Sequence, residues 1–227
     1  MSSRPLALVT GASRGIGAAI ARALGPTHRV LLGGRDRSAL DAMVAELPDA
    51  LAWPVDLADT AAVAAATAEI GSLDVLVHSA GVAALGTVER ASARDWRVNF
   101  EVNVLAVVEL TRRLLPALRA AGGHVVLINS GAGYNARPGW GPYAVSKFGL
   151  RAFADVLRAE EESSGLRVTS VYPGRTATGM QEAIVAGEGR EYDPDQFLRP
   201  ESVASAVLAA VTATPDAHLT EVIIRPR

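Results

Sequence analysis

Short apolar runs alternate with amphipathic segments along the whole chain, and this alternation restricts the fold more than any other feature. The apolar runs are rich in valine and leucine, which is typical of strands buried on both faces of a parallel sheet. Strands that alternate with helices predict a doubly wound parallel α/β sheet of about seven strands, with ligands at the carboxyl ends of the strands. The expected strands are Leu6–Val9, Val30–Leu32, Leu51–Val55, Val75–Val77, His124–Ile128, Arg167–Tyr172 and Val222–Ile224, and the expected helices cover residues 15–24, 37–46, 59–70, 92–120, 143–163 and 200–212.

Chain length and composition favour one domain. The chain has 227 residues, 49% of them hydrophobic, which is enough to bury a substantial core, and no repeat or linker divides it. Residues 1–227 are therefore expected to form a single domain. The net charge of −2, without a basic block, gives no support for nucleic-acid binding. The absence of cysteine and the scatter of the four histidines argue against a metal site.

Two observations predict a cytoplasmic protein. Residues 1–5 lead directly into the first expected strand, which leaves no room for a signal peptide. No apolar run reaches the roughly 18 residues that a membrane-spanning helix needs, so we expect no membrane span.

Residues 179–200 interrupt the alternation. They include Gly187, Gly189 and Pro194, carry mixed charge and show no clean period. An irregular segment of this length in a compact domain is often a lid over a ligand site. We expect these residues to form a substrate lid.

A glycine-rich turn joins the first expected strand to the first expected helix. It runs Thr10-Gly11-Ala12-Ser13-Arg14-Gly15-Ile16-Gly17. Glycines let the backbone turn sharply and approach a ligand, and the amino end of the following helix presents free amides to phosphate. An ordinary tight turn is the alternative, but the position between strand and helix favours a cofactor site.

Tyr143 and Lys147 lie four residues apart and share one face of an expected helix. A neighbouring ammonium group favours the phenolate, so the pair is able to exchange a proton with an alcohol oxygen near neutral pH. Ser130 lies thirteen residues before the tyrosine, at the end of an expected strand.

These motifs together resemble those of the short-chain dehydrogenase/reductase family, over essentially the whole chain. The resemblance rests on the glycine turn, on Ser130 before Tyr143-x-x-x-Lys147, and on Pro173-Gly174-Arg175-Thr176-Ala177-Thr178. It implies a Rossmann-type domain and an NAD(P)-dependent oxidoreductase acting on a carbonyl/alcohol pair. The chain lacks the family's common V-D-G-G ending and is more similar to the short, NADP-preferring members that act on 3-hydroxy acids, and to related carbonyl reductases.

The resemblance also implies roles for single residues. Tyr143 is the expected general acid and base, Lys147 lowers the pKa of the tyrosine and binds the nicotinamide ribose, and Ser130 binds the substrate oxygen. Asn103 holds a water in the proton relay, although Asn99 competes for this role. Ser79, Ala80 and Gly81 take the place of the family's N-A-G, and the serine puts the sheet-bracing bonds of that asparagine in doubt. The expected cofactor contacts are Gly11, Ser13, Arg14, Gly15, Ile16, Gly17, Arg35, Asp56, Leu57, Ala80, Gly81, Tyr143, Lys147, Pro173, Gly174, Thr176 and Thr178.

The residues after the second expected strand favour NADP(H) over NAD(H). NAD sites use a carboxylate there for the ribose 2′-hydroxyl, whereas NADP needs a cation for the 2′-phosphate. Gly34 occupies the position of the acid, Arg35 follows it, and Arg14 lies in the glycine turn. The alternative is a solvated Arg35 paired with Asp36, which comes one position too late to be the discriminating acid.

The substrate walls expected from family positions are mostly apolar, namely Val82, Leu85, Tyr134, Trp140 and Met180. They predict a small, uncharged carbonyl or alcohol, and Arg137 and Arg175 are the nearest candidates for binding an anion.

The family's usual dimer surface, the long helices at 92–120 and 143–163, predicts a homodimer or homotetramer. A catalytically silent NADP-binding regulator is the alternative function, although such proteins usually lack the tyrosine or lysine. An epimerase or dehydratase of the extended branch needs a longer chain.

Overall fold

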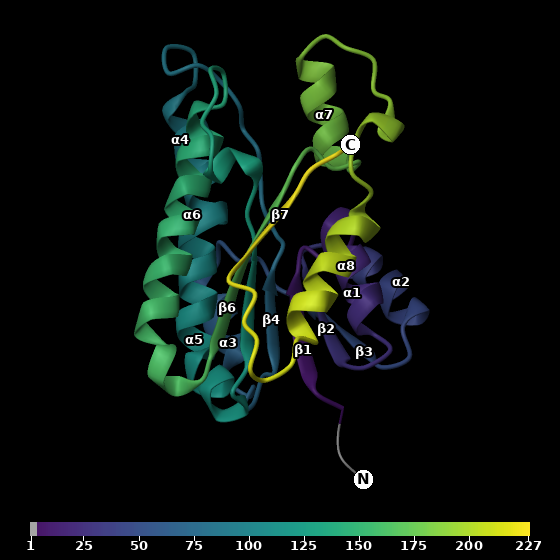
Figure 1. Ribbon diagram of the computed structural model, residues 1–227. Coiled ribbons are helices and arrows are strands. Elements are labelled where there is room, and N and C mark those ends of the chain that lie inside the picture. The colour runs from purple at the N-terminus through teal and green to yellow at the C-terminus, as the bar shows by residue number, and fades with distance from the viewer. Residues whose placement is uncertain (1–3) are drawn as a thin grey trace.

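Seven parallel strands form one sheet in the order β3-β2-β1-β4-β5-β6-β7 within residues 4–227, the part of the chain that the computed structural model describes (Figure 1). This confirms the predicted doubly wound sheet. The strands are β1 Leu6–Thr10, β2 Arg29–Gly34, β3 Ala50–Pro54, β4 Val75–His78, β5 His124–Ile128, β6 Arg167–Pro173 and β7 Glu221–Ile224. Residues 1–3, part of the segment on which the absence of a signal peptide was predicted, lie outside the described residues.

The strand order reverses between β1 and β4. β1 pairs with β2 on one side and with β4 on the other, both in parallel. The connections leave the carboxyl ends of these two strands in opposite directions, which opens a crevice where ligands bind in sheets of this type. The glycine turn after β1 lies at this crevice.

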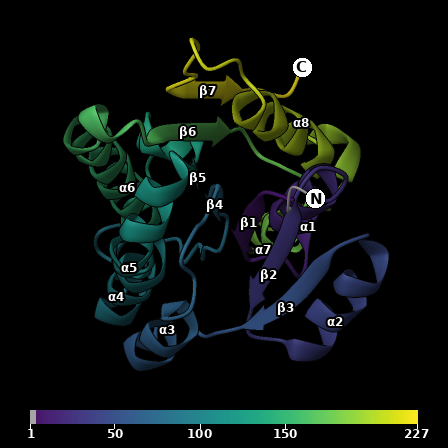
Figure 2. The same cartoon turned by 90° about the horizontal axis from the view of Figure 1, so that it is seen from below.

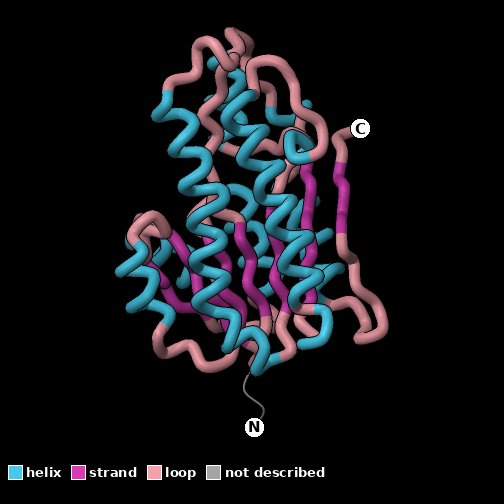
Figure 3. The backbone as a smooth tube through the Cα atoms, turned by 90° about the vertical axis from the view of Figure 1, so that its left-hand side faces the viewer, coloured by secondary structure: helices cyan, strands magenta, loops and turns pink. Residues whose placement is uncertain are grey.

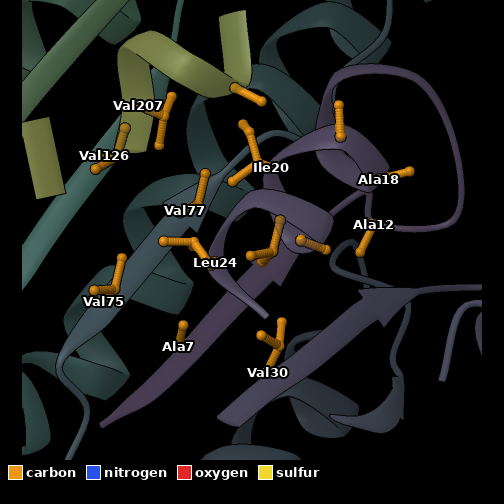
Figure 4. Packing of buried hydrophobic residues seen from close by; sticks show 14 of the residues in the cluster. Ala7, Ala12, Ala18, Ile20, Leu24, Val30, Val75, Val77, Val126 and Val207 are labelled. Atoms are coloured by element: carbon orange, nitrogen blue, oxygen red, sulfur yellow. The ribbon is translucent and has the colours of Figure 1, made fainter. Parts of the chain in front are cut away.

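Helices cover both faces of the sheet (Figures 2 and 3). One face carries α1 Gly15–Leu24, α2 Arg37–Glu46 and α8 Pro200–Val211; the other carries α3 Thr60–Thr67, α4 Ala93–Phe100, α5 Ala106–Ala121 and α6 Gly141–Glu160. Each face has its own apolar core. Figure 4 shows the first, in which Ile20 and Leu24 of α1 and Val207 of α8 pack on Val77. The second contains Leu110, Leu114 and Leu150 from α5 and α6.

The long helix expected at residues 92–120 contains a wider turn. Ser92 and Asp95 form a capping box that begins α4, and residues Glu101–Leu105 then form a π-helical turn before α5. An extra residue in such a turn changes the direction in which its side chains point, and π turns are frequent at functional sites. Asn103 lies inside this turn.

The expectation of a wholly irregular segment at 179–200 is wrong, because its first part is helix α7, Gly179–Gly187. The side chain of Thr178 caps α7 by accepting a hydrogen bond from Gln181 N at 3.3 Å, and Val185 is buried. The glycines at both ends hid this short helix. The base of the segment is tied down, since Leu198 N donates to Arg175 O at 3.0 Å. In Figure 1, α7 stands above the carboxyl ends of the strands.

None of the helices in residues 4–227 combines the length and the apolar character that crossing a membrane requires.

Candidate active site

A cavity of about 500 Å³ opens at the carboxyl ends of the strands. Several segments that are far apart in the sequence line it. They contribute Ile16 from the glycine turn, Ser130 after β5, Trp140 and Tyr143 at the start of α6, Pro173, Gly174, Thr176 and Thr178 after β6, and Met180 from α7. The structure therefore brings the serine and the tyrosine of the predicted catalytic set to one cavity.

Asn129 orients Ser130 relative to helix α6. Its side-chain oxygen accepts a hydrogen bond from Ser130 N at 2.9 Å, and its amide nitrogen donates to Lys147 O at 3.1 Å. A Cβ on Gly133 would lie 2.5 Å from that oxygen, so glycine is needed there. This small network ties the end of β5 to the helix that carries Tyr143 and Lys147.

Lys147 is buried behind Tyr143. Its Nζ donates to Ile128 O at 3.0 Å and lies 5.8 Å from the centroid of the Tyr143 ring. Only 5% of the lysine is exposed. Burial lowers the pKa of Lys147 to about 8, because removing the ammonium from water disfavours its charged form.

The expected lowering of the tyrosine pKa by Lys147 is not what this structure shows. Burial raises the pKa of the Tyr143 phenol, and only the Ser130 hydroxyl acts in the opposite direction. Tyr143 is therefore a protonated phenol at neutral pH, which is the form that a general acid needs.

Asn103 joins helix α6 to the loop after β4. Its Oδ1 accepts from Val82 N and its Nδ2 donates to Val82 O, both at 2.9 Å, and Nδ2 also donates to Ser146 Oγ at 3.0 Å. Asn99 instead donates to Ala84 O at 3.0 Å. A Cβ on Gly81 would lie 3.2 Å from Asn103 Oδ1 and 3.9 Å from Lys147 Nζ. Of the two asparagines that compete for the relay role, Asn103 is thus the one beside Gly81.

The glycine turn has the shape that a phosphate site needs. Gly11 has a φ of +66°, and a Cβ on Gly17 would lie 2.2 Å from Gly11 O, so a side chain has no room there. Arg14 is the N-cap of α1 and its side chain makes no capping bond, so the first amides of α1 are not capped by it. The residues present therefore fit the pyrophosphate of a dinucleotide.

Thr10 supplies the brace that the serine at position 79 put in doubt. Its hydroxyl accepts hydrogen bonds from Ser79 N at 3.0 Å and from Ala80 N at 3.1 Å, and it donates to Val77 O at 3.3 Å. Sequence reasoning missed this role, although the threonine directly before Gly11 was part of the quoted motif.

The end of β2 does not show the alternative pairing of Arg35. Asp36 is the N-cap of α2 and accepts a hydrogen bond from Ala39 N at 3.1 Å, so its carboxylate has another task. Arg14 and Arg35 are exposed, and no ion pair is recorded for either within residues 4–227. After β3, Asp56 Oδ1 accepts from Ala58 N at 3.0 Å, and Leu57 follows it.

Only two of the five expected substrate walls line the cavity, namely Trp140 and Met180. Tyr134 lies elsewhere: its hydroxyl donates to the Glu221 carboxylate, and its ring centroid is 4.3 Å from that of Tyr172. Val82 is held by Asn103, and neither it nor Leu85 is part of the lining. Ile184, Gln196 and Phe197 also line the cavity, and all three belong to the segment 179–200 that the sequence predicts as a substrate lid. Sequence reasoning missed Arg225 and Pro226, whose segment lacks any motif that points to a site.

Comparisons with known proteins identify the family of this chain. The short chain dehydrogenase family matches residues 5–189. The glycine betaine reductase ATRR of Emericella nidulans is 36% identical over 99% of this chain, which spans only 19% of that protein. Dehydrogenase/reductase SDR family member 7B of Bos taurus is 35% identical over 90% of this chain and 69% of its own length. The Danio rerio protein of that name is covered over 65% of its length. An uncharacterized short-chain type dehydrogenase/reductase of Sinorhizobium fredii is 32% identical over 100% of this chain and 93% of its own.

Solved structures with the same fold hold NADP-type cofactors. The alcohol dehydrogenase of the archaeon Thermococcus sibiricus, complexed with 5-hydroxy-NADP, matches with a TM-score of 0.87 and 26% identity over 96% of this chain and 95% of that chain. A metagenomic short-chain oxidoreductase in complex with NADP has a TM-score of 0.83 and 33% sequence identity, and the match covers 99% of this chain and 98% of that chain. Actinorhodin polyketide ketoreductase with NADPH has a TM-score of 0.90 and 26% sequence identity, and the match covers 98% of this chain and 97% of that chain. These complexes support an NAD(P) site in this protein. Together with the family match, they identify it as an oxidoreductase of the short-chain type. The chain belongs to the short-chain dehydrogenase family.

Proposed function

We propose that this protein transfers hydride reversibly between NADP(H) and a carbonyl/alcohol pair, with Tyr143 as general acid in reduction and general base in oxidation. The observation that carries the proposal is the lining of one cavity by Ser130 and Tyr143 together with Thr176 and Thr178. NADPH, when bound, supplies the hydride. Every other step uses side chains of this chain.

The Ser130 hydroxyl donates a hydrogen bond to the substrate's carbonyl oxygen and stabilises the negative charge that develops on it. The Tyr143 phenol gives its proton to the same oxygen. Lys147 binds the nicotinamide ribose hydroxyls and places a positive charge behind the ring of Tyr143. The amide of Asn103, fixed by Val82 and Ser146, holds the water that returns a proton toward Lys147.

Cofactor binding follows from the same elements. The turn from Gly11 to Gly17, with Ser13 and Ile16, surrounds the pyrophosphate, and Arg14 and Arg35 bind the 2′-phosphate. Asp56 and Leu57 contact the adenine, and Ala80 and Gly81 also contact the cofactor. Thr176 and Thr178, positioned by Pro173 and Gly174, contact the nicotinamide carboxamide. Residues 179–200, with α7 as their first part, act as the lid over the substrate.

Tyr143→Phe tests the proposal directly. Only the hydroxyl is removed, so we expect kcat to fall at least about a hundredfold, the range for a lost general acid, while the Kd of NADPH is retained. Lys147→Ala should lower kcat and also weaken the binding of NADPH, because the lysine serves both the tyrosine and the ribose. Near-normal turnover of any confirmed substrate by Tyr143→Phe would sink the assignment.

The regulatory alternative gains no support from the comparisons, and Ser130, Tyr143, Lys147 and Asn103 are all in place. A homodimer or homotetramer formed through α4, α5 and α6, the helices expected at 92–120 and 143–163, remains our proposal for assembly. Large apolar side chains are exposed along these helices and the π turn between α4 and α5, namely Val98, Phe100, Leu105, Val145, Phe148 and Val156. Buried apolar surface is the main driving force for such association.

The cytoplasmic location stays a prediction.

A further inference from the structure

Three arginines line the cavity that contains Ser130 and Tyr143. Arg137 lies in the loop before α6, Arg175 follows β6 and Arg225 follows β7, so three separate segments supply them. Hydride transfer to an uncharged ketone gives none of these guanidinium groups a task. Like charges repel one another, so their convergence on one cavity points to an anion.

The charge in the lining is unbalanced. Glu188 is the one acidic residue among the described lining residues, and it accepts a hydrogen bond from Arg175 at 2.9 Å. No ion pair is recorded for Arg137 or Arg225 anywhere in residues 4–227. Two positive charges are therefore left over, and a concave site with walls of low dielectric strengthens their attraction for an anion.

The sheet positions the backbone at Arg225, an exposed residue, and a missing side chain leaves room for its guanidinium. Gly174 N donates to Ile224 O at 2.8 Å, which ties the residue before the arginine to the segment after β6. Nη1 of Arg225 lies 2.7 Å from the place that a Cβ on Gly131 would take. The glycine therefore leaves room for the guanidinium at position 131, the residue that directly follows Ser130, which holds the substrate oxygen in the proposed reaction.

We propose that the substrate is an oxo acid, or the corresponding hydroxy acid in the reverse direction, whose carboxylate is bound by Arg225 together with Arg137 or Arg175. The inference rests on the proposed hydride transfer. NADPH gives a hydride to the carbonyl carbon, Tyr143 gives a proton to its oxygen, and the carboxylate is unchanged. A planar guanidinium matches a carboxylate with two parallel hydrogen bonds and so orients the substrate. This substrate differs from the small, uncharged carbonyl or alcohol expected from the sequence.

The test compares acids with their neutral counterparts. NADPH oxidation is followed with 2-oxobutanoate, 4-oxopentanoate and 5-oxohexanoate, each against its methyl ester. We expect kcat/KM to favour at least one acid over its ester by about tenfold or more. Arg225→Gln should abolish that preference, mainly through the KM of the acid and without a rise in the KM for NADPH. Arg227→Gln, in the same segment but outside the lining, should keep the preference.

Two further variants separate an anion site from a structural role. Gly131→Ala should lower the acid-to-ester ratio too, because its methyl group displaces the guanidinium, and Arg225→Lys should recover part of the ratio. Equal losses for acid and ester, or a raised KM for NADPH, would overturn the proposal and assign Arg225 to the fold or the cofactor.

A binding measurement covers the case in which no ketone is reduced. Calorimetric titration of butanoate and of butanamide into the enzyme with NADP then shows whether the cavity binds an anion. Stronger binding of butanoate that disappears in Arg225→Gln would sustain the anion site and sink the proposed reaction. Equal binding of the two compounds would overturn the anion site itself.

Discussion

Arg35 is the side chain on which the proposed preference for NADP(H) depends. It is exposed, and no ion pair within residues 4–227 has to break before it binds a phosphate. Charge-assisted hydrogen bonds contribute about 1.5–3 kcal/mol each, so Arg35→Ala is expected to lower kcat/KM for NADPH at least about tenfold and to leave NADH little changed. Arg37→Ala is the matched control, because that arginine is paired with Asp41 at 3.0 Å. Equal kcat/KM values for NADPH and NADH in the native protein would contradict the prediction.

The sequence predicted which residues meet at the cavity better than it predicted their electrostatics. Motif spacing, read through the resemblance to a known family, put Ser130 and Tyr143 in one site, and the residues after β5 and at the start of α6 do meet at the same edge of the sheet. The direction of the Tyr143 pKa shift depends on burial, which no local pattern reports. Tyr134 was misplaced for a similar reason, since its partners Tyr172 and Glu221 come from β6 and β7.

Helix α7 is the element whose motion the structure predicts most clearly. It contributes Met180, Gln181 and Ile184 to the cavity, while residues 186–191 beyond them are all exposed. Segments with few buried contacts open at low free energy cost, so residues 179–197 should exchange amide hydrogens fastest within the described fold and slow down when NADP and substrate bind. Helix α8, which follows directly and is buried at Val203 and Val207, is the internal control and should not change. Protection of α7 without ligand at the level of β5 would show that it is fixed structure.

Most elements were predictable because their apolar periodicity is clear, and the two that were not depend on tertiary contacts. The π turn at Glu101–Leu105 carries Asn103, whose amide pairs with the backbone of Val82. That contact lies far away in the sequence, so a continuous helix was the natural expectation. Helix α7 is short, and its cap at Thr178 belongs to a motif that was assigned to the cofactor instead.

The stability of the folded protein should fall as the pH drops from 7 to 5. Burial is the main cause that lowers the pKa of all four histidines, to about 3 for His78 and His124 and downward for His28 and His218. In the unfolded chain they titrate near pH ~6.5. Below that value the unfolded state binds more protons than the native state, so the free energy of unfolding decreases, by up to about 1.4 kcal/mol per pH unit for each histidine.

Denaturant unfolding at a series of pH values checks this expectation. His124→Gln removes one titrating group, so it should make the decrease between pH 7 and 5 shallower. Carboxylates with lowered pKa values, such as those of Glu109 and Glu161, lose their contribution only at lower pH and do not interfere. A constant free energy of unfolding across this range would refute the prediction.

The close approach of Gly131 and Arg225 also constrains how this protein is able to evolve. A methyl group at position 131 would lie 2.7 Å from Nη1 of Arg225, the far end of a flexible side chain, so a substitution there requires the guanidinium to shift. Under the proposed anion site, a lineage that gains a side chain at position 131 moves the guanidinium and weakens its acid preference. Glycine after Ser130 and arginine after the last strand should then be inherited as a pair. That covariation is a signature by which genomes can be searched for relatives with the same substrate class.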